Sequence, residues 1–186
     1  MTSTSLVCTP GFTHQYKQLN ALLSELRGGG YPVSILGVPC NQFGHQEPAA
    51  NRTELHNSLR YVRPGAGYFP AFNLTGRSDV NGGDELPLYS YLKSKCAAPG
   101  HASYPKTETF WDPIKPTDIT WNFEKFLIGP NGHPLLRFMP DVEPFDLRPI
   151  LTEARGSDLS HHLAELELTV GERVKAKEKL KRFRHH

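Results

Sequence analysis

Three side chains that carry N–H donors, but have no acid–base chemistry of their own, lie in two separate runs of this sequence. Gln42 lies in the run from Val38 to Gly44, and Trp121 and Asn122 open the run from Trp121 to Leu127. An amide or an indole can point an N–H group at an anion and stabilise it without competing as a nucleophile. Such donors are useful at a site where negative charge develops during a reaction.

The elements that must position these donors are two strands. Gln42 follows the short apolar run 33–38, whose β-branched residues predict a strand covered on both faces. Trp121 and Asn122 come just before a second predicted strand, and residues at strand ends are commonly presented for function. Each residue alone has a plainer interpretation, because a single Trp is more often core and loop amides usually satisfy nearby backbone.

The candidates for a nucleophile or a metal ligand are weak. Cys8, Cys40 and Cys96 are an odd number at wide spacings, which suits neither a disulfide framework nor a zinc site. None has a neighbouring base in the sequence that would favour its thiolate. The histidines also lack the spacing of a metal site. We therefore predict no metal and a reducing compartment.

Alternating helices and strands predict an α/β fold. Gly28-Gly29-Gly30 ends the first helix, whose leucines share one face, and Gly129-Pro130-Asn131-Gly132 is a strong hairpin signal. Helices are predicted over 13–28, 51–59, 86–95 and around 147–151, and strands over 33–38, 123–128 and 134–138.

Composition predicts one soluble domain over residues 1–155 and a basic extension over 156–186, helical or disordered. The chain has 186 residues, of which 38% are hydrophobic, with a formal net charge of +2. Residues 171–186 alone carry seven Lys or Arg and two Glu. Such a tail could touch nucleic acid or anionic lipid, but a solvated terminus is the favoured interpretation, with no nucleic-acid or membrane partner. The sequence shows neither an apolar run of membrane-spanning length nor a signal peptide at its start.

Taken together, three runs resemble the glutathione peroxidases. They are NQFGHQEP at 41–48, DVNG followed by PLYSYLK between 79 and 93, and WNFEKFLIGPNG at 121–132. The resemblance extends from about Gly11 to about Arg155. It implies a thioredoxin-like fold in which helices flank a central mixed sheet, with a first strand shortened to a stub at 4–8. It also implies that Gln42, Trp121 and Asn122 surround a selenocysteine or cysteine that reduces peroxides.

The nucleophile itself is missing. The family's U-G-x-T-x-x-Y run, where U is the nucleophile, aligns with residues 10–16 and places Pro10 at that position. Proline cannot attack an O–O bond, so this chain is predicted to be inactive. The family resemblance implies reduction of hydrogen peroxide and organic hydroperoxides by glutathione, with no further cofactor.

Two interpretations of the missing nucleophile stay open. In the first, the gene encodes a selenium-type peroxidase and the printed chain bypasses the selenocysteine codon, which is normally read as stop. In the second, the chain is a non-catalytic subunit that binds or co-assembles with a catalytic relative.

The resemblance also implies partners. The run from Tyr61 to Gly67 is similar to a loop of the tetrameric members, which implies a homotetramer. Leu59 and Arg60 stand where thioredoxin-dependent members carry a resolving cysteine, which favours glutathione as reductant. Arg63 and Arg137 match basic positions and are predicted to bind the glutathione carboxylates. We expect a cytoplasmic location, with a secreted form left open.

Overall fold

The computed structural model describes residues 2–5, 12–98 and 106–153, and its centre is a five-stranded mixed sheet. The strand order is β3-β2-β1-β4-β5, in which β1, β2 and β3 are parallel and β4 is antiparallel to both β1 and β5. The strands are β1 (Thr2–Ser5), β2 (Ile35–Val38), β3 (Asn73–Leu74), β4 (Lys125–Ile128) and β5 (Pro134–Phe138). The prediction of an α/β fold with a central mixed sheet is confirmed.

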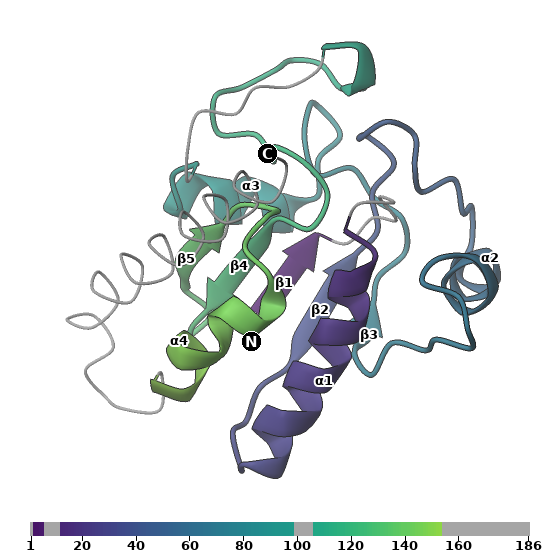
Figure 1. Cartoon of the computed structure of the whole chain (residues 1–186). Coiled ribbons are helices and arrows are strands. Elements are labelled where there is room, and N and C mark those ends of the chain that lie inside the picture. The colour runs from purple at the N-terminus through teal and green to yellow at the C-terminus, as the bar shows by residue number, and fades with distance from the viewer. Residues whose placement is uncertain (1, 6–11, 99–105, 154–186) are drawn as a thin grey trace, which may run out of the picture.

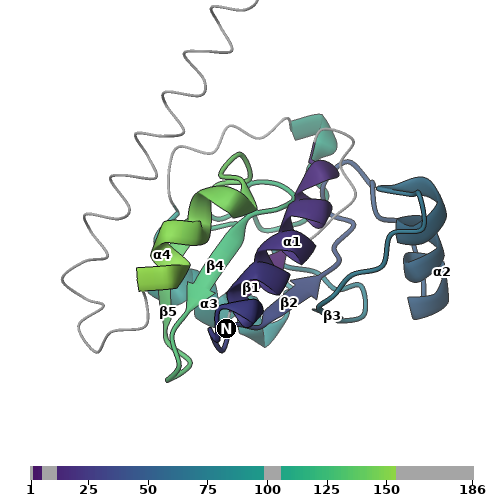
Figure 2. The same ribbon diagram turned by 60° about the horizontal axis from the view of Figure 1, so that its bottom comes forward.

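Helices cover both faces of this sheet. Figures 1 and 2 show α1 and α4 on one face and α3 on the other. This two-sided cover explains why β2 is almost entirely apolar. The helices are α1 (His14–Gly28), α2 (Arg52–Asn57), the π-helix η1 (Ser58–Val62), α3 (Pro87–Lys95), the 3₁₀ helices η2 (Lys106–Glu108) and η3 (Pro144–Leu147), and α4 (Arg148–Glu153).

Helix α1 follows directly from the apolar spacing. All five apolar residues that predicted it are buried, and they divide between two clusters of the core: Tyr16, Leu19, Leu22, Leu23 and Leu26. At its C-terminal end the backbone N–H of Tyr31 donates to the carbonyl of Leu26 at 2.9 Å, and Gly30 takes a φ of +76°. A glycine tolerates this left-handed conformation at no steric cost, so the helix ends where the glycine run predicts.

Strand β4 separates the two sides of the core because neighbouring side chains alternate between faces. Leu127 packs with the cluster under α1 and α4, whereas Phe126 packs with the cluster under α3. The Phe126 ring lies edge-on to Tyr89 of α3, with centroids 6.2 Å apart. Packing on both faces of the sheet therefore fixes the start of β4, and with it the end of the loop that precedes this strand.

Several boundaries differ from the predictions. The first strand lies at Thr2–Ser5 instead of 4–8, and it is the central strand of the sheet. Strand β3 was not predicted, because two residues carry no periodic signal. The helix capped by Asn51 is confirmed, although its α-helical part ends at Asn57 and continues as a π-helix to Val62. The predictions for Cys8, for Pro10 and for residues 156–186 lie outside the described residues.

Lys125 is a buried cation at the start of β4. Its ammonium group donates to the carbonyls of Pro140 at 2.9 Å and Val142 at 2.5 Å, and the residue is only 2% exposed. Burial lowers the pKa of Lys125 from its ordinary value of 10.5 to about 7, although four nearby carboxylates oppose the shift. Among the described residues, no helix has the length and apolar character needed to cross a membrane.

The stability of the protein should rise with pH because of Lys125. Below pH 7 both the folded and the unfolded states hold the proton, and the folded state bears the full cost of burying the charge. Between pH 7 and 10.5 the unfolded state binds more protons, so the free energy of unfolding increases, by up to about 1.4 kcal/mol per pH unit.

Urea unfolding at several pH values between 6.5 and 9.5 tests this. The variant Lys125→Met should lose the rise that the original chain shows, while the control Lys95→Met, at an exposed position, should keep it. Equal slopes in the two variants would contradict the assignment.

Candidate functional site

Two loops bring the amides of Gln46 and Asn122 together. The Nδ2 group of Asn122 donates to Oε1 of Gln46 at 3.3 Å, across 76 positions of sequence. Asn122 is fully buried and lies just before β4, while Gln46 is half-buried and lies in the loop after β2. Gln46 was not among the predicted site residues, although it belongs to the same run as Gln42.

A tight turn delivers Gln46 to this position. Gly44 and His45 have φ angles of +62° and +50°, so two consecutive residues are left-handed. A Cβ atom at Gly44 would lie only 3.1 Å from Nε2 of Gln46, and its positive φ also disfavours any other residue. The turn is held from outside, because the N–H of Gly44 donates to the carbonyl of Glu108 at 2.8 Å.

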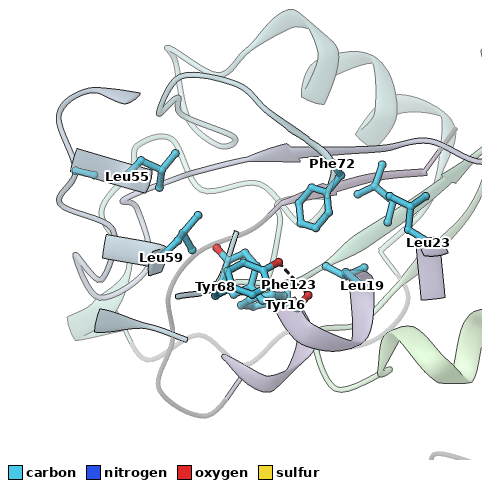
Figure 3. Packing of buried hydrophobic residues seen from close by; sticks show 10 residues of the cluster. Tyr16, Leu19, Leu23, Leu55, Leu59, Tyr68, Phe72 and Phe123 are labelled. Atoms are coloured by element: carbon cyan, nitrogen blue, oxygen red, sulfur yellow. Dashed lines mark hydrogen bonds between the residues drawn. The ribbon is translucent and has the colours of Figure 1, made fainter. Parts of the chain in front are cut away.

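The second loop is fixed by Phe123. This residue has a φ of +65°, a conformation that costs a bulky side chain about 1 to 3 kcal/mol. Its fully buried ring lies edge-on to Tyr16 of α1, with centroids 5.0 Å apart (Figure 3), and 6.2 Å from the ring of Phe12. The packing holds the preceding Trp121 and Asn122 beside the N-terminal end of α1.

Trp121 is half-buried between the site and the core. Its ring packs against Phe43, with centroids 5.8 Å apart, and Phe43 belongs to the loop that also carries Gln46. The ring of Phe43 in turn lies edge-on to Trp111 at 5.4 Å. Of the predicted donors, the structure thus brings Trp121 and Asn122 to one place, joined there by Gln46.

Gln42 faces a different set of partners. Its Oε1 accepts from the backbone N–H groups of Val80 and Asn81, both at 3.0 Å, and its Nε2 donates to the carbonyl of Asn81 at 2.8 Å. The residue is 4% exposed. Its amide therefore ties the loop after β2 to residues 80–81, which is the plainer interpretation of a loop glutamine.

The two arginines predicted to bind glutathione lie in different surroundings. The guanidinium of Arg137 is buried against Glu124, to which its Nε donates, and it also donates to the carbonyls of Thr117 at 2.9 Å and Asp118 at 2.8 Å. Arg137 therefore stabilises the segment before Trp121 and does not lie at an exposed site where a glutathione carboxylate could bind. Arg63 follows η1 and is partly exposed.

The described cysteines offer no activated thiol. Burial raises the pKa of Cys40 to about 12, so its thiol stays protonated near neutral pH. Cys96 is buried at the end of α3, and neither of the two forms a disulfide. Within the described ranges, no three His, Cys, Asp or Glu side chains gather in a way that could hold a metal ion.

Comparisons with known proteins point to one family. The family model described as glutathione peroxidase matches residues 3–93. The chain is 51% identical over 128 residues to the epididymal secretory glutathione peroxidase of Rattus norvegicus, covering 69% of this chain and 57% of that protein. It is 49% identical over 128 residues to glutathione peroxidase 3 of Rattus norvegicus, covering 69% of this chain and 55% of that protein.

Two solved structures share the fold. The crystal structure of Trgpx in apo form matches with a TM-score of 0.54 and 28% identity, covering 82% of this chain and 78% of the other. The crystal structure of T. cruzi GPX1 matches with a TM-score of 0.53 and 24% identity, covering 82% of this chain and 79% of the other. The predicted thioredoxin-like fold is confirmed.

The extent of the similarity corrects one boundary. The family match begins at residue 3, so the expectation that the resemblance starts only at about Gly11 was wrong. The chain spans less than three fifths of the length of these relatives, 57% and 55% in the two cases given.

The two glutamines should differ in their effect on stability. Gln42→Ala removes an amide that satisfies three buried backbone groups, each of which costs about 1 to 3 kcal/mol when left without a partner. We expect roughly 3 kcal/mol of destabilisation, measured by urea unfolding. Gln46→Ala, the matched control, removes one long hydrogen bond, the one from Nδ2 of Asn122 at 3.3 Å, so it should cost less, about 1 kcal/mol. Equal losses in the two variants would contradict this division.

Proposed function

Because the chain belongs to the glutathione peroxidase family, we propose that its fold serves the reduction of hydrogen peroxide and organic hydroperoxides by glutathione. The observation that carries the proposal is the hydrogen bond from Asn122 to Gln46, beside Trp121 and next to the start of α1. We further propose that a chain of this sequence does not itself reduce peroxides, because Pro10 occupies the nucleophile position.

The proposed chemistry needs donors of this kind. A thiolate or selenolate attacks one peroxide oxygen, an S–O or Se–O bond forms, the O–O bond breaks, and the departing oxygen takes a proton and leaves as water or alcohol. Two glutathiones then return the oxidised group to its reduced state and release water and glutathione disulfide. Amide and indole N–H groups stabilise the anionic nucleophile and the leaving oxygen without reacting themselves.

We assign the donor roles to Gln46, Trp121 and Asn122, with Gln42 as a positioning residue. Position 10 lies outside the described residues, which resume at Phe12. The ring of Phe12 packs against Phe123, the residue after Asn122.

The binding of glutathione and the cellular location stay predictions. Arg63 is the better of the two predicted carboxylate ligands, because it is partly exposed while Arg137 is buried against Glu124. A cytoplasmic location was the prediction from the sequence. A relative that is named as secretory fits the secreted form that was left open.

We also propose a homotetramer, in keeping with the loop from Tyr61 to Gly67. Tyr61 and Val62 are 67% and 64% exposed at the end of η1, where adjacent apolar side chains favour association. A light-scattering mass of four chains is expected, and Val62→Glu should reduce it. Ile114→Glu, at a site 54% exposed, is the control and should leave the mass unchanged. A single-chain mass for the original protein would contradict the proposal.

Restoring a nucleophile tests the enzymatic proposal. The variant Pro10→Cys should consume hydrogen peroxide in the presence of glutathione, while the original chain should not. Adding Gln46→Ala to that variant should lower the rate at least tenfold, because one donor to the developing charge is lost. Turnover by the original chain would place the nucleophile elsewhere. A folded but inactive Pro10→Cys variant would favour the non-catalytic interpretation.

A further inference from the structure

A groove separates α2 from the edge of the sheet. Its volume is about 590 Å³, and one wall is formed by α2 and the other by the chain that leads into and out of β3. Figures 1 and 2 both place α2 outside β3, at the end of the sheet away from β5. The lining residues are Arg52, Leu55 and His56 from α2, and residues 69–76.

The sheet edge in this groove presents backbone groups that can pair with another strand. β3 is the last strand of the sheet and pairs with β2 along one side only. The N–H of Thr75 donates to the carbonyl of Gly37 in β2 at 2.9 Å, so the backbone groups of Thr75 face β2. Because these groups alternate along a strand, the N–H and C=O of Leu74 face the groove.

The side chains beside this edge would suit an apolar residue and a carboxylate. Phe69 is 63% exposed and its ring stacks on His56, with centroids 5.0 Å apart and planes 18° apart. Arg52 lines the groove, and the lining contains no Asp or Glu. Among the described residues, Arg52 has no ion-pair partner.

We propose that this groove binds an extended, acidic segment of a partner protein, which adds a strand to the outer edge of β3. The main chain of the segment pairs with Leu74, an apolar side chain covers Phe69, and a carboxylate meets Arg52. Main-chain pairing supplies affinity in this mode of recognition, and the side-chain contacts supply specificity. The acidic character follows from the charge of the lining.

The groove is separate from the peroxide site and from the proposed tetramer loop. None of the residues 61–67 lines it, and neither does Gln46, Trp121 or Asn122. The proposal therefore stands or falls without the peroxidase proposal. Because β3 has only two residues, few ladder bonds can form, and the affinity should lie between micromolar and millimolar.

Nuclear magnetic resonance titration of the full chain tests the proposal. The probe is the capped peptide Ser-Glu-Val-Thr-Val-Glu-Ser, and the control probe carries Lys in place of both Glu residues. We expect saturable binding of the acidic probe, with the largest shifts at the amide of Leu74 and around Phe69. A probe that is N-methylated at its two central residues should not bind, because the ladder donors are blocked.

Matched variants locate the contacts. Arg52→Ala should weaken binding of the acidic probe about fivefold and Phe69→Ala about tenfold, consistent with one exposed ion pair and one aromatic contact. Arg27→Ala and Ile114→Ala, at exposed positions outside the groove, should leave it unchanged. No saturation at millimolar probe, equal binding of the Lys probe, or shifts confined to other surfaces would each overturn the proposal.

Discussion

The contact between Phe123 and Tyr16 is the interaction on which the site depends. It joins the loop before β4 to the first turn of α1, two parts of the chain that are more than a hundred residues apart. Phe123 adopts a left-handed backbone conformation to make this contact. The burial of its ring offsets the conformational free energy that this backbone costs. The contact acts together with the packing of Trp121 on Phe43 to hold Asn122 toward Gln46.

Buried charged side chains stabilise the loop of residues 111–124, which ends at this contact. Asp118 accepts from Trp111 at 2.8 Å and from the ammonium of Lys93 at 3.0 Å, and the carboxylate of Glu124 accepts from the N–H and the hydroxyl of Thr120 at 2.7 and 2.8 Å. Arg137 closes the arrangement against Glu124. Buried pairs add little net stability, but breaking one leaves a buried charge uncompensated, so they keep residues 111–124 in one conformation.

The sequence predicts elements whose signals are local and misses features that depend on tertiary partners. The leucine spacing of α1, the cap at Asn51 and the glycine-rich hairpin before β5 are readable because each acts within a few residues. Whether Gln42 or Gln46 belongs to the candidate site cannot be predicted in this way. It depends on which side-chain amide bonds to residues 80–81 and which bonds to Asn122, and both contacts are tertiary. The burial of Arg137 is likewise invisible in the sequence, because Glu124 becomes its neighbour only through the pairing of β4 with β5.

The proposed donors and the nucleophile position belong to different parts of the chain. Replacing the residue at position 10 therefore need not disturb the loops that carry the donors. The turn at Gly44 is held by Glu108, and the loop of Asn122 is held by Tyr16, so neither contact uses the side chain at position 10. Under the proposed function, a change at position 10 would remove the attacking atom without breaking either of these contacts. If the proposed function holds, the loss of peroxide chemistry and the loss of the scaffold are therefore physically separate effects, because the contacts that hold the proposed donors do not include the attacking atom.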